Sequence, residues 1–262
     1  MVKLRVLYLG QKPIGRSCFY RLLAKRNAIE IAGVVSNTTV ENWWRDRSIA
    51  DLCLQERIPL ISNHRRDSSG LRTMIGDRRV DVLLSVQHPW ILPAGLLDAV
   101  GGRAFNLHLA KLPEYKGWHA CSHALLNGDA SFTSTIHWMV PEVDSGAIAY
   151  EESFRIAPRD TARSLYTRAE AVGLRLFEQL LEELIKGRLP PQHLPTGVAR
   201  FYDRTGLDPL RGVDPNVEPA LLDLRARAFF FPPFEPAFIR WHDHKVYLLP
   251  QEARREDARC SW

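Results

Sequence analysis

Two kinds of hydrophobic pattern alternate along the first hundred residues: short continuous apolar runs, and stretches in which apolar residues recur at helical spacing. Residues Leu4–Leu9 form a mainly apolar run, and Ile29–Val35 is a second run rich in β-branched residues. Continuous runs of this kind predict strands that are buried on both faces of a sheet. Between them, Pro13 opens a stretch whose apolar residues recur at helical spacing, which predicts a helix packed on that sheet.

The same alternation continues. Ile49–Leu54 predicts a helix, and Val80–Val86 and Ala104–His108 predict two further strands. Strands that alternate with helices are typical of α/β proteins. The expected fold class is therefore α/β, with a Rossmann-like, mostly parallel sheet flanked by helices.

The pattern changes after residue 130. Thr133–Met139 and Ala147–Ile156 predict two strands joined by a short turn. Asp160 and Thr161 then provide capping side chains for a long helix with one apolar face, which ends at Gly187.

Proline and turn residues become frequent beyond residue 190. Leu221–Ala228 predicts a short helix, and Ala237–Leu249 predicts a hairpin. We therefore expect a core domain over residues 1–190, a small C-terminal α+β subdomain over 191–250 and a flexible tail over 251–262.

Composition narrows the functional class. The chain has 262 residues, 45% of them hydrophobic, and a net charge of +5, which suits an anionic small ligand and is too weak to indicate nucleic-acid binding. Its 4 cysteines include no CxxC pair, so a reducing, cytoplasmic location is expected. No apolar run is long enough for a membrane span, and neither a signal peptide nor a membrane partner is expected.

The candidate chemistry lies at the end of the strand predicted over Ala104–His108. Asn106 and His108 are two residues apart, so both side chains point to one face of that strand. Ligands of open α/β sheets bind outside the carboxyl ends of the strands. Asp144, in the loop after the next strand, could orient and charge the imidazole. These groups could stabilise an oxyanion, with the nucleophile supplied by the substrate; the alternative is ordinary local hydrogen bonding.

Longer motifs surround these residues. The run from Phe105 to Gly117, F-N-L-H-L-A-K-L-P-E-Y-K-G, resembles the central motif of formyltransferases that use 10-formyltetrahydrofolate, close to F-N-x-H-P-S-x-L-P-x-Y-R/K-G. The segment from Thr135 to Gly146 resembles that family's T-x-I-H-x-M-x-x-x-x-D-x-G. The resemblance extends over about residues 80–190.

The resemblance implies a set of roles. Asn106, His108 and Asp144 fall on the family's catalytic residues, which transfer a formyl group to a primary amine. The resemblance implies a folate pocket lined by Gln87, Trp90, Ile91, Leu92, Val140, Pro141, Glu142 and Val143, largely through main-chain atoms. Position in the chain, rather than the resemblance, makes Gln11, Lys12, Lys111, Tyr115 and Trp118 candidates for binding the acceptor. Tyr115 and Trp118 could stack on a base or sugar, or could simply pack.

Two departures from the family pattern concern the acceptor. Leu109-Ala110 replaces the Pro-Ser pair that follows the histidine, and Lys111 and Lys116 add positive charge near the site. The three catalytic positions are intact, so these changes bear on which amine is formylated.

Several acceptors are open. The C-terminal segment Arg227–Ala237 is similar to R-A-x-x-F-P-P-x-x-P-A of sugar N-formyltransferases, which favours an amino-deoxy sugar linked to GDP or dTDP, as in surface-polysaccharide or O-antigen synthesis. The alternatives are methionyl-tRNA, another small amine, a formyltetrahydrofolate hydrolase or a silent binding domain. About 70 residues after position 190 are fewer than a tRNA-binding domain is expected to need, and the hydrolase is expected to carry an N-terminal regulatory domain.

The remaining features receive simpler interpretations. His119, Cys121 and His123 do not share one helix face, so no metal is expected. The turn Gly10–Gly15 is not GxGxxG and gives no support for NAD. Trp43-Trp44 is interpreted as packing or an interface, and the aromatic run Phe229–Phe234 as core or as a contact of the expected homodimer.

Overall fold

Alternating strands and helices build the sheet that the sequence predicts. The structure is a computed structural model that describes residues 2–38, 48–62, 68–251 and 253. It separates into two compact units that interleave along the chain: residues 1–108, 134–152 and 172–197 form unit 1, and residues 109–133, 153–171 and 198–262 form unit 2. The sequence analysis expected a single domain boundary at residue 190, which is a different kind of division, and this boundary stays a prediction.

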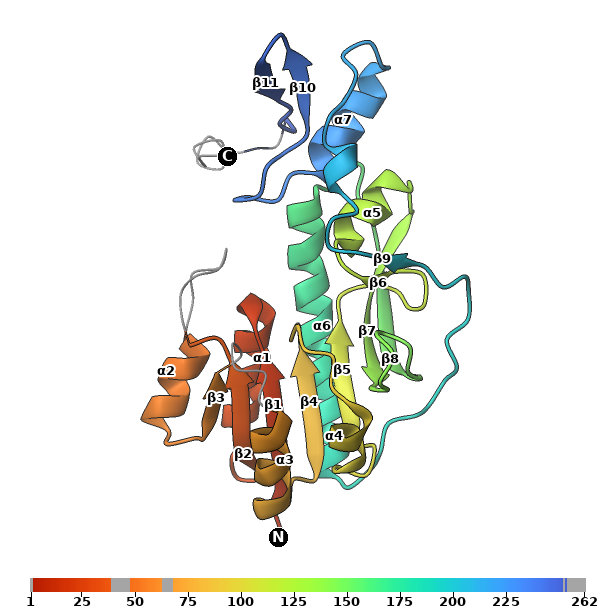
Figure 1. Ribbon diagram of the computed structural model, residues 1–262. Coiled ribbons are helices and arrows are strands. Elements are labelled where there is room, and N and C mark those ends of the chain that lie inside the picture. Colours follow the sequence, from red (N-terminus) through yellow and green to blue (C-terminus); the bar gives the residue numbers. More distant parts are fainter. Residues whose placement is uncertain (1, 39–47, 63–67, 252, 254–262) are drawn as a thin grey trace. The chain divides into compact units, whose positions relative to one another are not determined.

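A seven-stranded sheet has the order β3-β2-β1-β4-β5-β7-β8 (Figure 1) and belongs to unit 1 except for the first residues of β7 and the last residues of β8. The strands are β1 (Leu4–Gly10), β2 (Ile29–Ser36), β3 (Leu60–Ser62), β4 (Val82–Val86), β5 (Ala104–His108), β7 (Ser131–Trp138) and β8 (Ile148–Arg155). Strands β3, β2, β1, β4 and β5 pair in parallel, and β7 pairs with β5 in the antiparallel direction. The predicted mostly parallel sheet is confirmed.

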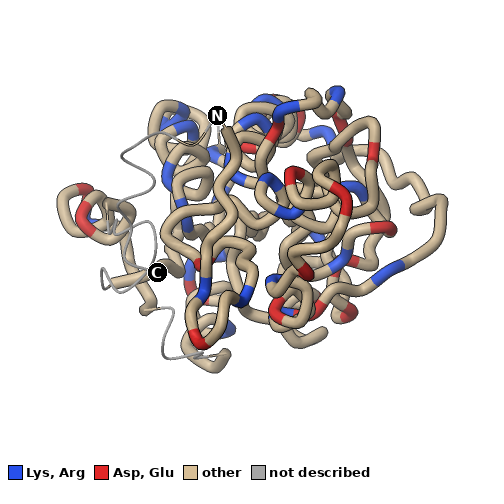
Figure 2. Tube along the Cα trace, turned by 90° about the horizontal axis from the view of Figure 1, so that it is seen from above, with Lys and Arg blue, Asp and Glu red and all other residues tan. Residues whose placement is uncertain are grey.

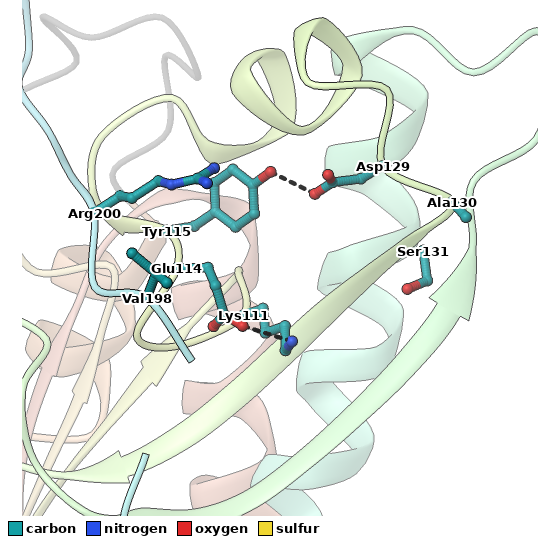
Figure 3. Close-up of a pocket in the computed structure, with 8 residues that line it drawn as sticks. All are labelled: Lys111, Glu114, Tyr115, Asp129, Ala130, Ser131, Val198 and Arg200. Atoms are coloured by element: carbon teal, nitrogen blue, oxygen red, sulfur yellow. Dashed lines mark hydrogen bonds and ion pairs between the residues drawn. The ribbon is translucent and has the colours of Figure 1, made fainter. Parts of the chain in front are cut away.

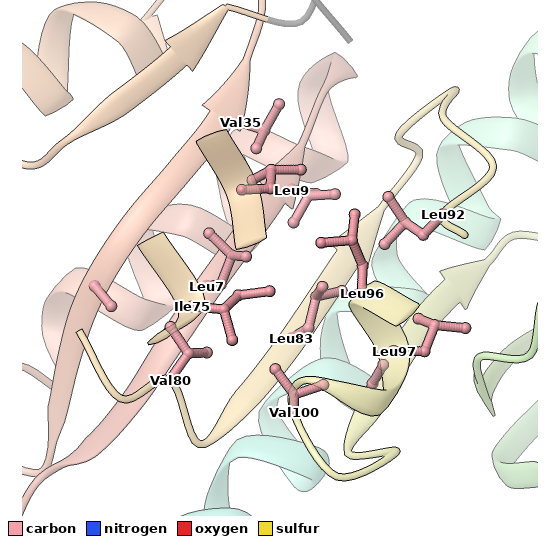
Figure 4. Close-up of a cluster of buried hydrophobic side chains, with 13 residues drawn as sticks. Leu7, Leu9, Val35, Ile75, Val80, Leu83, Leu92, Leu96, Leu97 and Val100 are labelled. Carbon is pink, nitrogen blue, oxygen red and sulfur yellow. The ribbon is translucent and has the colours of Figure 1, made fainter. Parts of the chain in front are cut away.

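The described helices of unit 1 are α1 (Lys12–Ala24), α2 (Ser48–Gln55), α3 (Ser68–Asp77), α4 (Ala94–Asp98) and the second half of α6 (Ala162–Ile185). Strand β1 shows why helices cover both faces. Leu7 and Leu9 point into one cluster with residues of α3 and α4 (Figure 4), whereas Tyr8, pointing the other way, packs on Phe19 of α1 and Phe177 of α6. Fully burying each of these side chains contributes about 1.5–3 kcal/mol.

Unit 2 is assembled from shorter elements. They are β6 (Lys116–Gly117), α5 (Ala120–Leu126), the first half of α6, β9 (Phe201–Tyr202), the 3-10 turn η2 (Asp208–Leu210), α7 (Pro219–Ala228), β10 (Phe238–Trp241) and β11 (His244–Tyr247). The capping prediction holds: Thr161 Oγ1 accepts from Ser164 N at 3.1 Å, and Ser164 Oγ accepts from Thr161 N at 2.9 Å. The predicted hairpin is also present, as β10 pairs antiparallel with β11.

The sequence missed β3, α3, α4, α5 and the β6–β9 pair, all of them short. Trp43-Trp44 and most of the predicted tail lie outside the described residues. Lys and Arg are distributed along the whole trace with Asp and Glu among them (Figure 2). None of the described helices is both long enough and apolar enough to cross a membrane.

Candidate active site

Strand register brings Asn106 into contact with a second polar side chain. The antiparallel pairing of β5 with β7 sets Asn106 opposite His137 and His108 opposite Thr135. Residues directly opposite each other on neighbouring strands point to the same face and lie within contact distance. Accordingly, Asn106 Nδ2 lies 3.0 Å from His137 Nε2.

The loop after β7 carries Asp144 back over the same face. Asp144 Oδ2 lies 3.7 Å from His108 Nδ1, and Asp144 Oδ1 lies 3.5 Å from His137 Nε2. The structure thus brings together Asn106, His108 and Asp144, the three residues proposed from the sequence. One carboxylate faces two imidazoles, and this second imidazole is a feature that the sequence analysis did not assign.

The loop can turn back because Gly146 has no side chain. A Cβ at this position would lie 1.8 Å from the carbonyl oxygen of Trp138. The same turn is closed by a hydrogen bond from Trp138 N to Ala147 O at 2.8 Å. Asp144 itself has a φ of 48°, in the left-handed region that is uncommon for residues other than glycine. Backbone conformation therefore fixes where the carboxylate stands.

Burial strengthens the contacts within the cluster. The side chains of His108, His137 and Asp144 are 10%, 4% and 11% exposed, and Asn106 is half-buried. Hydrogen bonds and charge interactions are stronger in such a low-dielectric site than in water. Because Asn106 is only half-buried, a ligand can contact its side chain.

The first predicted folate loop follows β4. Gln87 opens it with a φ of 55°, and Leu92 is buried in the core cluster, against which Trp90 also packs. Ile91 is 68% exposed. The Leu92 side chain is committed to the core, so any ligand contact from this residue comes from its main chain.

His88, in the same loop, was not identified from the sequence. Trp90 N donates to His88 Nδ1 at 3.3 Å, so the proton of the neutral ring is on Nε2. Burial lowers the pKa of His88 to about 3. Nε2 is buried and has no hydrogen-bond partner within the described part of the chain. A buried donor of this kind fits a ligand rich in acceptor atoms, such as a pterin.

The second predicted folate loop joins β7 to β8. Val140 is 38% exposed, Pro141 and Glu142 are exposed, and Val143 is half-buried. These four residues directly precede Asp144, so a ligand bound along this loop would lie beside the carboxylate.

Gln11 and Lys12 follow β1, where the strand order reverses. Strand β1 lies between β2 and β4, and ligands of open sheets bind at such a switch point. Lys12 Nζ donates to Gln87 Oε1 at 2.9 Å, which joins a predicted acceptor residue to the predicted folate loop. Gln11 is buried, and its Nε2 has no partner among the residues that the structure describes.

The other three predicted acceptor residues lie in unit 2. Lys111 and Tyr115 line a cavity of about 420 Å³ (Figure 3), where Lys111 Nζ pairs with Glu114 Oε1 at 2.6 Å and the Tyr115 hydroxyl donates to Asp129. Burial and the hydrogen bond to Asp129 raise the pKa of Tyr115. Trp118 is 40% exposed, with the Arg204 guanidinium 5.7 Å from its ring centre. The complete lining is Lys111, Glu114, Tyr115, Asp129, Ala130, Ser131, Val198 and Arg200.

The histidines around α5 have other partners. His119 precedes the helix with a φ of 60° and donates through Nε2 to the Arg204 carbonyl at 2.9 Å, whereas His123 stacks on Tyr202 with ring centres 3.9 Å apart. Within the described residues, no three His, Cys, Asp or Glu side chains are grouped to hold a metal ion.

Comparison with known proteins places this geometry in a family. Residues 3–181 match the formyl transferase family model, which is more than half of the chain. The chain therefore belongs to the formyl transferase family, and the resemblance drawn from its motifs is confirmed.

Individual relatives agree with this assignment. A GDP-perosamine N-formyltransferase of Brucella melitensis is 32% identical over 171 residues, which is 65% of this chain and 64% of that protein; the chain thus matches less than two thirds of this relative's length. Two solved structures share the fold. One is a sugar N-formyltransferase from Shewanella, with 20% identity and a TM-score of 0.76 over 94% of this chain and 96% of the other. The other is an N-formyltransferase from Helicobacter canadensis with folinic acid and dTDP-3-aminofucose, with 18% identity and a TM-score of 0.73 over 94% and 86%.

Proposed function

We propose that this protein is an N-formyltransferase that moves the formyl group of 10-formyltetrahydrofolate to the primary amine of a nucleotide-linked amino-deoxy sugar. The observation that carries the proposal is the buried cluster of Asn106, His108 and Asp144 at the end of β5. It is supported by membership of the formyl transferase family and by relatives that formylate sugar amines.

Each member of the cluster has a distinct task. Asn106 N–H and a protonated His108 donate hydrogen bonds to the oxygen of the formyl group as negative charge develops on it. Asp144, 3.7 Å from His108 Nδ1, orients the imidazole and stabilises its charge. Donors held in advance in a buried site need no reorganisation during the reaction, and each can contribute 10²–10³ to the rate.

The bonding changes balance without a nucleophile from the protein. The folate supplies the activated formyl carbon when it is bound. A bond forms between the acceptor nitrogen and that carbon, and the bond from the carbon to the folate nitrogen breaks. Asp144 accepts the proton that the amine loses, and this proton ends on the folate nitrogen.

The acceptor class follows from charge and from relatives. The chain has a net charge of +5, and Lys12 stands at the switch point of the sheet, where a diphosphate could meet it. The named relatives act on GDP-perosamine or were solved with dTDP-3-aminofucose. We therefore favour a 4-amino- or 3-amino-deoxyhexose linked to GDP or dTDP, used in the cytoplasm for surface-polysaccharide or O-antigen synthesis.

The C-terminal aromatic segment supports a homodimer. Phe229 and Phe230 are buried, whereas Phe234, Trp241 and Val246 are 46%, 63% and 46% exposed. A contact with a second copy of the chain would cover these exposed apolar side chains. Sedimentation at micromolar concentration is expected to show a dimer, and a monomer would refute this part of the proposal.

The function is tested by formyl transfer to a panel of acceptors. The full chain is incubated with 10-formyltetrahydrofolate and, in separate reactions, GDP-linked amino sugars, dTDP-linked amino sugars, methionyl-tRNA, glycinamide ribonucleotide and no acceptor. Turnover with one sugar nucleotide is expected. Turnover only with methionyl-tRNA or a small amine would refute the sugar nucleotide as acceptor and identify the other amine instead. Consumption of the folate without an acceptor would indicate a hydrolase.

A further inference from the structure

His137 has a hydrogen bond at each ring nitrogen. Nδ1 lies 2.8 Å from the carbonyl oxygen of Trp138, and Nε2 lies 3.0 Å from Asn106 Nδ2. The residue is 3% exposed, so water does not compete for either bond. Both neighbours are held by the strand: Trp138 is the next residue of β7, and Asn106 is the directly opposed residue of β5.

These contacts determine where the ring carries its proton. A carbonyl oxygen can only accept, so Nδ1 carries hydrogen and donates to Trp138. The amide nitrogen of Asn106 can only donate, so Nε2 is unprotonated and accepts. His137 is therefore neutral, in the tautomer with its proton on Nδ1.

The same bond fixes the amide of Asn106. Its NH₂ group has two hydrogens, and one is bound to His137 Nε2. Among the described residues, Asn106 makes no other side-chain hydrogen bond. The second N–H is thus held in a fixed direction and stays available to a ligand. Without an acceptor at His137, the amide could turn over and present its oxygen, which repels an oxyanion.

The neutral ring also decides how Asp144 is used. Asp144 Oδ1 is 3.5 Å from His137 Nε2, and Oδ2 is 3.7 Å from His108 Nδ1. A protonated His137 would compete with His108 for this single negative charge. Because Nε2 is unprotonated and accepts from Asn106, it has no hydrogen to donate to Asp144. The negative charge of Asp144 therefore stabilises a protonated His108.

We propose that His137 is a positioning residue: as the Nδ1-protonated tautomer it orients the Asn106 amide toward the reacting oxygen and leaves the charge of Asp144 to His108. This inference rests on the proposed function, since it refers to the same site, but its structural half can be tested without any acceptor.

The first test is spectroscopic. ¹⁵N NMR of the histidine-labelled full chain at neutral pH, with the His137 signal assigned by its loss in His137→Gln, reports the protonation of each ring nitrogen. One protonated Nδ1 and one unprotonated Nε2 are expected. Two protonated nitrogens, or a proton on Nε2 alone, would overturn the proposal whatever the protein formylates.

The second test compares two variants at the same position. A glutamine side chain can place an amide oxygen near the position of Nε2 and so accept from Asn106, whereas leucine cannot accept. We expect His137→Gln to keep kcat within about fivefold of the wild type and His137→Leu to lower kcat about 10²-fold. KM for the folate should change little in both, because Asn106 acts on the charge that develops during the reaction.

A double-mutant cycle separates positioning from an independent role. If His137 acts through Asn106, then adding His137→Leu to Asn106→Ala should cost less than about threefold further in kcat. Multiplicative losses would overturn the proposal, as would equal losses in His137→Gln and His137→Leu. Since the glutamine variant keeps the hydrogen bond, it also controls for loss of folding, which thermal unfolding of all variants would check.

Discussion

Two regions of this protein contain the same kinds of side chain and use them differently. The cluster at the end of β5 in unit 1 and the cluster around Tyr202 in unit 2 each combine an amide, histidine and a carboxylate. In unit 1, the amide of Asn106 bonds to one ring nitrogen and keeps a hydrogen for a ligand. In unit 2, the amide of Asn127 donates to the hydroxyls of both Tyr115 and Tyr202, at 2.9 Å and 3.3 Å.

The difference lies in what surrounds the polar groups. Tyr202 stacks on His123 and on Tyr115, with ring centres 3.9 Å and 5.6 Å apart, and Tyr115 donates to Asp129. Burial, with the nearby His119 as a second cause, lowers the pKa of His123 to about 4, so this ring is neutral at physiological pH. In unit 2, ring stacking and the two Asn127 hydrogen bonds hold the segment around β9, and the ring nitrogen that stays without a partner among the described residues, His123 Nε2, is buried. In unit 1, the half-buried Asn106 keeps an amide hydrogen that a ligand can accept. Residue type alone therefore does not distinguish the proposed reactive site from a structural cluster.

The largest expected effect belongs to the unit 1 cluster. In the proposed mechanism His108 donates to the developing oxyanion, so replacing His108 by Asn should lower kcat by about 10²–10³ with little change in the unfolding temperature. His193→Asn is the matched control, because His193 is exposed and uses only backbone atoms to bridge Ile148. Initial rates of formyl transfer check this, and near-normal turnover of His108→Asn would refute the catalytic assignment.

The next effect concerns stability against pH in unit 2. The folded-state pKa of His123 is about 4, against 6.5 for an unperturbed histidine. Between these values the unfolded chain binds a proton that the folded chain does not, so stability falls as pH decreases from about 6.5 to about 4. Each pKa unit corresponds to about 1.4 kcal/mol, which gives a loss of about 3 kcal/mol.

Substituting His123 by Phe keeps the ring that packs on Tyr202 and removes the titration. Urea unfolding of the two proteins at pH 7 and pH 4.5 should show a smaller decrease for the variant. Some decrease should remain, because the pKa of His88 in the folded protein is also low, about 3, so His88 likewise makes the free energy of unfolding fall as the pH decreases. An unchanged decrease in His123→Phe would mean that the pKa of His123 is the same in the folded protein as in the unfolded chain.

The smallest effect should come from the Asn127 amide. Asn127→Ala removes both hydrogen bonds to the tyrosine hydroxyls and should lower the free energy of unfolding by about 1–2 kcal/mol, with kcat unchanged. Asn216→Ala is a useful control. The exposed Asn216 side chain donates to the nearby Asp214 carboxylate at 3.0 Å, and its removal should cost less than about 0.5 kcal/mol. A loss of turnover in Asn127→Ala at unchanged stability would contradict the structural role.

Some of this arrangement could be predicted from the sequence. Asn106 and His108 share a face because strand side chains alternate, and the motifs identified the family. The pairing of Asn106 with His137 could not be predicted from local pattern, since it depends on which strand pairs with β5 and in which register. A usable signal was present: Thr135 and His137 repeat the two-residue spacing of Asn106 and His108.

Other misses have their own causes. Helix α3, Ser68–Asp77, contains Gly70 and Gly76 and has only Leu71 and Ile75 buried, so its apolar periodicity is weak. Strand β3 has three residues, too few for a pattern. His88 could not be recognised because its burial and its tautomer arise from the fold of the loop around it.

Gly146 has a consequence for the order in which this protein becomes competent. The loop that carries Asp144 is closed by the hydrogen bond from Trp138 N to Ala147 O, at the edge where β7 passes into β8, and it leaves no room for a side chain at Gly146. In a chain whose central parallel strands alone are folded, Asn106 and His108 would be in position on β5, but the Asp144 carboxylate would not yet lie beside them. If the proposed function is right, activity therefore depends on completion of the sheet's last strands. A residue with a side chain at position 146 would leave an otherwise ordered sheet without the Asp144 carboxylate in place.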